Sequence, residues 1–396
     1  MKIKENYNHT IYACFGSSTT QAIVNNFVPL LFVTFSTQFS ISLDKISLLV
    51  LFNFVTQLFV DICAPKIADK IGVRACVVAS QAFVAAGLIG LSIFPTILPD
   101  PFIGLIIAVV LYACGGGLVE VFVSPIVNAC PSKHKQATMS LLHSFYCWGQ
   151  VFVVLVSTIF FSVFQITNWY ILSLLWAILP LLDAIYLSRV PIPPLTEEGQ
   201  SGIGIKELLH SRVFLLAILA MICSGACEMA MGQWASAFAE IGLKVSKTLG
   251  DLAGPCMFAV LMGISRVLHA KIAHKTELRK IMTGSGIICI LGYILSAFSS
   301  WAIAGLIGCA LCGLGVGIMW PGILSITAER IPKGGATMFA ALALAGDIGC
   351  ISGPTIVGFL ANALSGDLKA GLAVAICFPV LLTISILFLT KKIKSN

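Results

Sequence analysis

Charged residues are scarce in this sequence. Asp, Glu, Lys and Arg together make up 10% of its 396 residues, whereas a soluble domain usually carries about 25%. Apolar residues account for 58% of the chain, and the mean hydropathy is +0.99. So few charges cannot cover the surface of a water-soluble fold of this length. The composition excludes a soluble protein and predicts an integral membrane protein without a soluble catalytic domain.

Motifs for catalysis and cofactor binding are missing as well. The six histidines are scattered, whereas an integral membrane enzyme would need them clustered with acids. No Walker motif is present to couple ATP. Gly313, Gly315 and Gly317 imitate part of a nucleotide fingerprint, but small residues at such spacing usually let membrane helices approach closely. Cys309 and Cys312 form a CxxC without a second pair, so we expect no metal, no cofactor and no enzymatic activity.

The basic residues do not form a surface patch. Although the net charge is +7, Lys and Arg are distributed among short loops, whereas nucleic-acid binding needs them on one water-facing surface. We therefore expect no nucleic-acid partner. The first 15 residues lack the apolar core and small-residue cleavage site of a removed leader. The first hydrophobic stretch is therefore expected to be a retained helix.

Apolar runs between glycine, proline and charge breaks predict twelve membrane-spanning helices. A span needs about 20 residues, so twelve spans leave only short connections. The predicted helices cover residues 9–37, 43–70, 72–98, 101–131, 135–164, 166–188, 208–241, 245–275, 278–299, 300–331, 333–364 and 366–392.

The distribution of Lys and Arg predicts the orientation of these helices. Cytoplasmic loops retain an excess of basic residues, and the predicted topology places 19 of the 24 on one side. The other side holds Lys45, Lys244, Lys247 and Lys369, and Arg266 alone falls within a span. Both termini are therefore predicted to be cytoplasmic, in the inner (cytoplasmic) membrane of the cell. An odd number of helices would scramble this separation.

The predicted helices form two halves. The longest polar segment separates an N-terminal half, residues 1–188, from a C-terminal half, residues 208–396, by a cytoplasmic linker, residues 189–207. The tripeptide Ala-Thr-Met opens both the fifth and the eleventh predicted helix, at residues 137–139 and 336–338. These matches predict an all-α protein of two pseudo-symmetric six-helix halves, an arrangement found in transporters.

Between the second and third predicted helices, the chain resembles the major facilitator superfamily. The superfamily signature G-x-L-x-D-x-x-G-x-[RK] is matched by Asp69, Gly72 and Arg74, whereas Pro65 replaces the leading glycine. The resemblance covers the whole chain and implies alternating access of two halves to a central site. It also implies that Asp69 gates the transporter by facing the start of the eleventh helix. Arg74 and Arg266 are the other candidate gating residues.

Within the superfamily, the chain is similar to the fucose and glucose/galactose permeases. The fourth helix of that branch carries an acid before a small polar residue and proline, like Glu120, Ser124 and Pro125 here. Its first helix carries Asn-Asp before proline, and the acid takes part in proton coupling. Here Asn25 and Asn26 occupy that place, so a two-carboxylate mechanism cannot be transferred intact.

Acids within the predicted spans need a reason, because a charge near the bilayer centre costs at least about 2.5 kcal/mol. Glu120 lies near the middle of its helix, and the resemblance implies that this helix lines the cavity. Glu228 lies on the seventh helix, which the resemblance also places at the cavity. We interpret both as proton-coupling and substrate-binding residues. The alternative for Glu120 is a structural acid that bridges helices.

Aromatic and amide groups near Glu228 fit a polyhydroxylated ligand. Gln233 can bind hydroxyl groups, and Trp234 can stack on the C–H face of a sugar. Trp320, on the tenth helix, would supply a similar platform. The alternative for a tryptophan is anchoring at the lipid interface, which fits Trp169 and Trp301 better because they lie at span ends.

Two charges in the C-terminal half admit two interpretations. Asp347 lies at the centre of the eleventh helix, and Arg266 can reach either His143 or an acid such as Asp347. A structural ion pair and a ligand site fit equally well. The predicted substrate-binding residues are Asn25, Asn26, Gln57, Glu120, His143, Glu228, Gln233, Trp234, Trp320 and Asp347.

Together these features predict a secondary active transporter. We expect it to move a small polar solute, a monosaccharide or polyol, by proton-coupled alternating access, and to work in the lipid bilayer as a monomer. The alternatives are a drug or metabolite exporter of the same fold, a uniporter, or a sugar sensor without transport. An exporter should have a cavity poorer in polar groups than this chain offers. Those polar groups are Asn25, Asn26, Asn53, Gln57, Glu120, Glu228 and Gln233.

Overall fold

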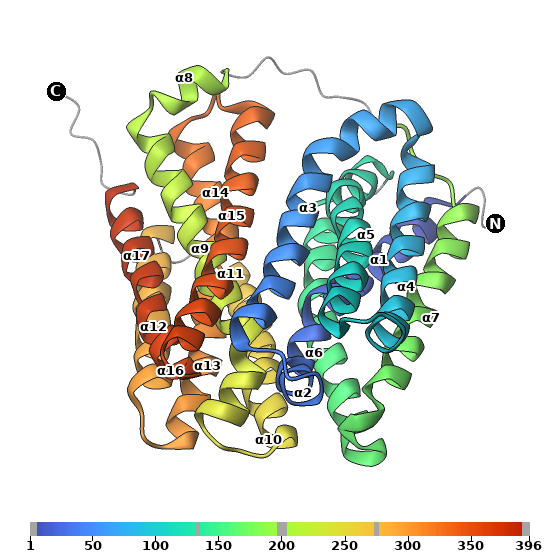
Figure 1. Cartoon of the computed structure of the whole chain (residues 1–396). Helices are drawn as coiled ribbons and strands as arrows, with labels where there is room; N and C mark the ends of the chain where they lie inside the picture. The colour runs from blue at the N-terminus through green and yellow to red at the C-terminus, as the bar shows by residue number, and fades with distance from the viewer. Residues whose placement is uncertain (1–5, 132–134, 196–203, 273–276, 390–396) are drawn as a thin grey trace. The chain divides into compact units, whose positions relative to one another are not determined.

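The structure, a computed structural model, describes residues 6–131, 135–195, 204–272 and 277–389 (Figure 1). Within these ranges, every regular element is a helix. The chain divides into an N-terminal unit, Met1–Glu197, and a C-terminal unit, Glu198–Asn396, and the division falls within the predicted linker. Linker residues 196–203 lie outside the described residues, as do several cations used to predict the orientation. These cations are Lys2, Lys4, Lys133, Lys275, Lys391, Lys392 and Lys394.

In its described residues, the N-terminal unit contains six long helical segments. Three of them, α3, α4 and α5, lie side by side (Figure 1). The elements in chain order are α1 (Tyr7–Asn26), a 3-10 turn (Val28–Leu31), α2 (Phe32–Gln38), α3 (Leu43–Ile71), α4 (Val73–Ile97), α5 (Pro101–Ala129), α6 (Lys135–Phe164), a second 3-10 turn (Ile166–Asn168) and α7 (Trp169–Arg189).

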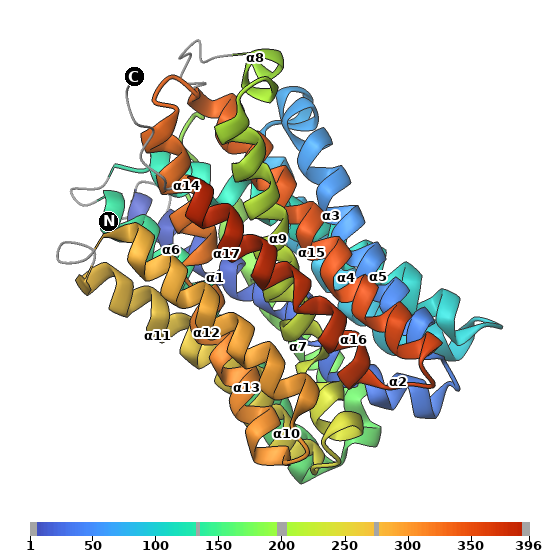
Figure 2. The ribbon, with the colours of Figure 1, turned by 90° about the vertical axis from the view of Figure 1, so that its left-hand side faces the viewer.

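The part of the C-terminal unit that the structure describes also forms six helical segments, several of them interrupted. Its α11, α12 and α13 lie side by side (Figure 2). The elements are α8 (Ile205–Leu209), α9 (Arg212–Ala237), a π-helical turn (Phe238–Gly242), α10 (Lys247–Asp251), a second π-helical turn (Leu252–Cys256), α11 (Met257–Ile272), α12 (Leu278–Phe298), α13 (Ala302–Val316), α14 (Met319–Arg330), α15 (Gly335–Ala363), α16 (Leu368–Ala375) and α17 (Cys377–Leu389).

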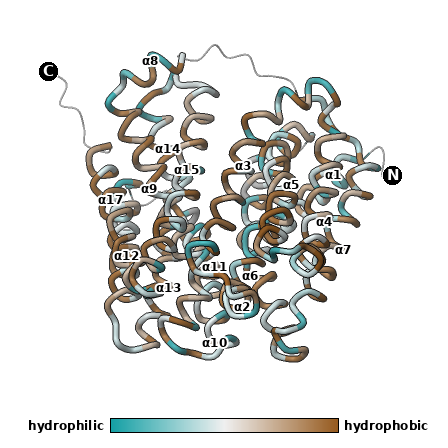
Figure 3. Tube along the Cα trace, in the orientation of Figure 1, coloured by the Kyte–Doolittle hydropathy of each residue, from teal (hydrophilic) through white to brown (hydrophobic). Residues whose placement is uncertain are grey.

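Eleven helical segments of the described chain are long and apolar enough to cross a membrane. Hydrophobic and neutral stretches accordingly dominate the helices in Figure 3. The first predicted helix, residues 9–37, is not among the eleven. Its α1 contains a run of polar residues from Ser17 to Gln21, and a 3-10 turn containing Pro29 separates it from α2. Proline has no N–H to continue the helical hydrogen bonds, which explains the interruption.

Glycines set the distance between α9 and α15 in the C-terminal unit. A Cβ at Gly225 would collide with the carbonyl oxygen of Gly346, and a Cβ at Gly349 would collide with that of Ile222. Only residues without a side chain allow two backbones to approach this closely. The sequence expectation that small residues serve helix packing therefore applies to this helix pair.

The two tryptophans at helix ends differ. Trp301 is 78% exposed, as an interface anchor would be. Trp169 is 2% exposed, its indole N–H donates to Gln38 at 2.9 Å, and its ring packs against Phe35. The expectation that Trp169 anchors at the lipid interface is therefore wrong, because its indole joins α7 to α2.

Candidate functional site

A buried network of four side-chain amides joins α1 to α3 in the N-terminal unit. Gln57 Nε2 donates to Asn25 Oδ1 at 3.1 Å and to Asn53 Oδ1 at 3.0 Å. Asn53 Nδ2 donates to Asn25 Oδ1 at 3.2 Å, and Gln21 Nε2 donates to Gln57 Oε1 at 2.8 Å. We call Gln21, Asn25, Asn53 and Gln57 the carboxamide network. It holds many donors and acceptors and no formal charge.

The carboxamide network extends to α6 and retains an acceptor of its own. Asn25 Nδ2 contacts the hydroxyl group of the half-buried Tyr146 at 3.4 Å. Among the described residues, no group donates to Gln21 Oε1, although this atom is buried. Because a buried acceptor without a donor is costly, this oxygen suits a hydroxyl group supplied from outside the chain.

Sequence reasoning included Asn25 and Gln57 in the site but missed Gln21. A signal was present, because Gln21 and Asn25 are four residues apart on one helix, and Asn53 and Gln57 are four apart on another. Residues at this spacing share a helix face. Two such polar pairs in apolar helices predict that the two faces meet.

The neighbours of the carboxamide network include two predicted site residues. A Cβ at Gly116 would lie 2.9 Å from Gln21 Oε1, so α5 packs directly on the network. Glu120 follows one turn later on the same face, and its side chain is exposed. Asn26 is buried, and its Nδ2 donates to the Ala22 carbonyl oxygen of its own helix at 2.9 Å.

His143 lies on α6 and is exposed. It precedes Tyr146 by three residues, so the two side chains lie on the same side of the helix. His143 thus lies one helical turn from Tyr146, the α6 residue that contacts Asn25.

In the C-terminal unit, Arg266 connects two predicted site elements. Its Nε donates to the Gly317 carbonyl oxygen at 3.1 Å, at the interruption between α13 and α14. The helical partner of that oxygen would be the N–H of residue 321, which is a proline and has none. The guanidinium also lies within electrostatic range of the buried Glu228 carboxylate.

Trp320 is seated on α15 next to Asp347. Both side chains are half-buried. A Cβ at Gly346 would collide with the indole ring of Trp320, so the ring lies directly on the backbone of α15. The C-terminal unit thus carries an acid, a guanidinium group and an indole on α9, α11 and α14.

Two other predicted residues lie deep in α9. Trp234 is fully buried, and its Nε1 donates to the Pro354 carbonyl oxygen of α15 at 2.9 Å. The indole therefore packs α9 against α15, which corrects the expectation of an open stacking platform. Gln233 is buried, with Nε2 3.9 Å from the Met229 sulfur. We leave Trp234 out of the candidate site.

Two of the three predicted gating residues, Asp69 and Arg74, lie around the turn between α3 and α4, whereas Arg266 lies on α11. Asp69 is exposed in the last turn of α3. Gly72 has φ +85° between the two helices, a conformation that favours glycine. Arg74 donates to the carbonyl oxygens of Leu187, Ser188 and Val190. Its positive charge thus caps the C-terminal end of α7, and the gate itself stays a prediction.

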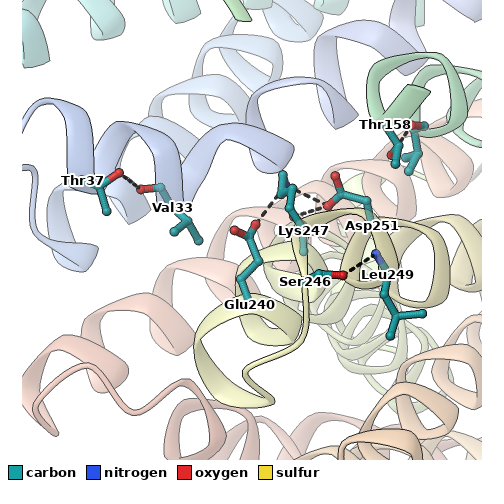
Figure 4. A network of polar contacts seen from close by, with 10 residues as sticks. Val33, Thr37, Thr158, Glu240, Ser246, Lys247, Leu249 and Asp251 are labelled. Atoms are coloured by element: carbon teal, nitrogen blue, oxygen red, sulfur yellow. Dashed lines mark hydrogen bonds and ion pairs between the residues drawn. The ribbon is translucent and has the colours of Figure 1, made fainter. Parts of the chain in front are cut away.

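A charged network that the sequence did not predict joins the end of α9 to α10 (Figure 4). Lys247 Nζ lies 3.0 Å from Glu240 Oε1 and 2.8 Å from Asp251 Oδ1. It also donates to Ser236 Oγ at 2.7 Å, and Ser236 Oγ donates to Asp251 Oδ1 at 2.6 Å. Asp251 is fully buried. One ammonium group thus holds two carboxylates between two π-helical turns, which often mark functional sites.

Comparison with known protein families matches most of the chain to one family. Residues 13–354 match the family model described as Major Facilitator Superfamily. The chain is also 22% identical over 260 residues to Membrane protein MosC of Rhizobium meliloti. That alignment covers 65% of this chain and 61% of the relative, so the chain spans less than two thirds of the relative's length.

Solved structures share the fold over nearly the full chain. The fucose:proton symporter FucP of E. coli has a TM-score of 0.65 and 18% identity, and the match covers 98% of this chain and 100% of that one. The xylose transporter XylE from E. coli has a TM-score of 0.75 and 13% identity, with 98% and 99% covered. A bacterial homolog of the human lysosomal transporter Spinster has a TM-score of 0.75 and 14% identity, with 98% of each chain covered. These likenesses confirm the predicted all-α, twelve-helix fold.

Proposed function

Because the chain belongs to the Major Facilitator Superfamily, we propose that it is a secondary active transporter for a small neutral solute rich in hydroxyl groups. A monosaccharide or a similar polyol fits this description. Transport would be driven by protons and would proceed by alternating access. We further propose that both termini are cytoplasmic and that the monomer is the working form.

The carboxamide network is the observation that carries this proposal. Each carboxamide offers two N–H donors and one oxygen acceptor without a formal charge. A sugar hydroxyl group is likewise both donor and acceptor. A charged substrate would instead need a counter-charge within the network, and its four members are neutral. The buried oxygen of Gln21 supplies an acceptor that a substrate hydroxyl group can fill.

The C-terminal unit supports the same class of solute. Trp320 presents an indole seated on Gly346, and an aromatic ring stacks well on the apolar face of a sugar ring. Glu228 can accept hydrogen bonds from hydroxyl groups, and Arg266 balances its charge. Within the C-terminal unit, an acid and an indole suit a ligand with hydroxyl groups and C–H faces.

Sequence resemblance supports the proton as the driving ion. The permease branch carries an acid at the place of Glu120, and this side chain is exposed on α5. Asn26 stands in place of the second acid of that branch. Glu120 would therefore act alone or with Glu228.

The experiment is a binding and transport screen on the purified full chain. Thermal unfolding with sugars, polyols, amino acids and drugs should show stabilisation by one neutral polyhydroxylated class. A ligand at 100 times its dissociation constant adds about 2.7 kcal/mol. Counterflow in liposomes should then show exchange of that solute, and an imposed proton gradient should drive its accumulation.

A variant pair connects the screen to the carboxamide network. Gln57→Leu removes the amide that contacts Gln21, Asn25 and Asn53, and should weaken solute binding about tenfold or more, because about 1–3 kcal/mol is lost with unpaired partners. Gln38→Leu is the matched control, because the amide that it removes accepts from Trp169, outside the carboxamide network. Stabilisation by drugs alone would identify an exporter, and exchange without proton-driven accumulation would identify a uniporter.

A further inference from the structure

A buried carboxyl group joins α7 to α1, away from the carboxamide network. Asp183 is 7% exposed, and its Oδ2 lies 2.7 Å from Ser17 Oγ. Ser17 is itself buried, and its Oγ also lies 3.2 Å from the Ala13 carbonyl oxygen. A Cβ at Gly16 would lie 2.9 Å from Asp183 Oδ1, so the backbone of α1 packs directly on the carboxyl group.

The two contacts of Ser17 Oγ compete for one hydroxyl hydrogen. The Ser17 hydroxyl group has one hydrogen, but two acceptor oxygens lie within hydrogen-bond distance of it. If Ser17 donates to Asp183 Oδ2, its contact with the Ala13 carbonyl oxygen has no hydrogen. If Ser17 instead donates to the Ala13 carbonyl oxygen, a second hydrogen is needed between Ser17 Oγ and Asp183 Oδ2. A protonated carboxyl group supplies it, and both contacts then become hydrogen bonds that run from Asp183 to Ser17 to Ala13.

Among the described residues, no cation forms an ion pair with Asp183. On α4, Arg74 donates to main-chain oxygens at the end of α7. Leaving a carboxylate unpaired within a membrane span is costly, whereas the protonated form carries no charge.

The described titratable groups within electrostatic range of Asp183 are a thiol and a phenol, which are neutral in their ordinary state. Cys14 lies within electrostatic range of both Asp183 and Cys130, and Tyr186 within range of Asp183. The Tyr186 hydroxyl group is 2.6 Å from His9 Nδ1, near the N-terminal end of α1. The helix α6 also touches α7 and carries Lys135, His143 and Cys147.

We propose that Asp183 is a proton-binding site of the N-terminal unit. While α1 is packed against α7, the carboxyl group holds one proton and donates it to Ser17 Oγ. On release, the proton passes to water and the carboxylate accepts the Ser17 hydrogen, which leaves the Ala13 contact without one. The site is distinct from Glu120 and Glu228, and it does not depend on which solute the protein carries.

Infrared difference spectroscopy on the full chain in lipid nanodiscs tests the proposal. An ordinary aspartate in water loses its proton near about pH 4, so it shows no band of a protonated carboxyl group at pH 7. The spectrum of the wild type minus that of Asp183→Asn at pH 7 should show this C=O band. Glu277→Gln is the control, because Glu277 is exposed at the start of α12, and its difference spectrum should lack the band. Absence of the band for Asp183 would overturn the proposal.

A second variant keeps the test valid if Asp183→Asn fails to fold. Ser17→Ala retains the carboxyl group but removes the acceptor of its proton, so the C=O band should remain and shift to higher frequency. An unshifted band would show that Ser17 does not accept the proton of Asp183.

The unfolding temperature should also fall as the pH rises from 6 to 9 in the wild type, because the folded chain binds a proton that the unfolded chain has released. In Asp183→Asn this fall should be smaller, and equal slopes would contradict the site.

Discussion

Arg266 donates its Nε hydrogen to the carbonyl oxygen of Gly317 at 3.1 Å. Pro321 stands where the chain would otherwise supply a backbone donor to that oxygen. The side chain from α11 thus completes an interrupted helix, and its guanidinium group also lies within electrostatic range of the Glu228 carboxyl group. One cation therefore connects α11 with the junction of α13 and α14 and interacts with α9.

We expect removal of this cation to destabilise the C-terminal unit. Arg266→Met leaves the Gly317 oxygen without a donor and should lower the free energy of unfolding by about 1–3 kcal/mol. Adding Glu228→Gln should recover part of the loss, because a neutral amide needs no counter-charge. Thermal unfolding of both single variants and the double variant measures the coupling. Arg279→Met, at an exposed position on α12, is the control, and strictly additive effects would argue against the Arg266–Glu228 link.

A second prediction concerns the seat of Trp320. Gly346→Ala places a methyl group where the indole ring lies, and overpacking of this kind typically costs about 1–3 kcal/mol. The ring should be displaced, and solute affinity should fall by roughly threefold to tenfold, as in Trp320→Ala, because stacking is worth about 0.5–1.5 kcal/mol. In the Trp320→Ala background, Gly346→Ala should cost little.

The control for the Trp320 seat is Gly284→Ala on α12. Among the described residues, no heavy atom beyond the glycine's own turn of helix lies within 4 Å of a Cβ at that position, and alanine is the better helix former. This variant should be as stable as the wild type or more so. If Gly346→Ala behaves in the same way, the indole does not depend on the glycine for its position.

The coupling prediction separates Glu120 from Glu228. Glu120 is exposed, whereas Glu228 is buried and faces a positive charge. We expect Glu120→Gln, a permanently neutral mimic, to abolish proton-driven accumulation in liposomes while solute exchange persists. Exchange needs alternation of the two states but no net release of a proton. Accumulation by Glu120→Gln would refute this role, and Glu228→Gln would then show whether the second acid carries the proton.

The network around Lys247 should contribute more to the free energy of unfolding than the exposed Lys280–Glu277 pair does. Lys247→Met leaves Glu240 and Asp251 without their shared ammonium group and should destabilise the protein by about 3 kcal/mol. We use the lower end of the range for buried pairs because the Lys247 side chain is 18% exposed. Lys280→Met is the matched control, because the Lys280–Glu277 pair is exposed and such pairs contribute about 0–1 kcal/mol. Equal losses of unfolding temperature would contradict a structural role for the buried network.

Helix boundaries were readable from the sequence where a polar break is sharp. The prediction of residues 135–164 coincides with α6, Lys135–Phe164, and that of 278–299 is within one residue of α12, Leu278–Phe298. Interruptions within spans were not foreseen. Pro29 splits the first predicted helix, and Gly317 separates α13 from α14. Apolar composition hides such breaks because hydropathy does not distinguish a continuous helix from two collinear ones.

The sequence indicates which polar residues lie in the membrane spans, but it does not indicate which residues their side chains contact. Gln57 was expected at the site, but its bonds to Gln21, Asn25 and Asn53 depend on how α1 is rotated against α3. Trp234 was expected on an open wall, and packing buried it against Pro354 instead. In a soluble helix, the polar face marks the side that meets water. In a membrane helix, lipid and neighbouring helices are both apolar, so composition does not show which side faces inward.

Composition, the spacing of polar breaks and the signature around Asp69 were sufficient for the class of protein, its twelve-helix fold and its family, because a bilayer imposes span length and apolarity on the sequence directly. Packing alone decided that four amides from two helices form one network, that Arg266 serves Gly317, and that Asp183 shares a hydrogen with Ser17. These contacts depend on the rotation and closeness of helices distant in sequence. Small residues such as Gly16, Gly116 and Gly346 permit that closeness, but nothing in their neighbouring sequence specifies the partner.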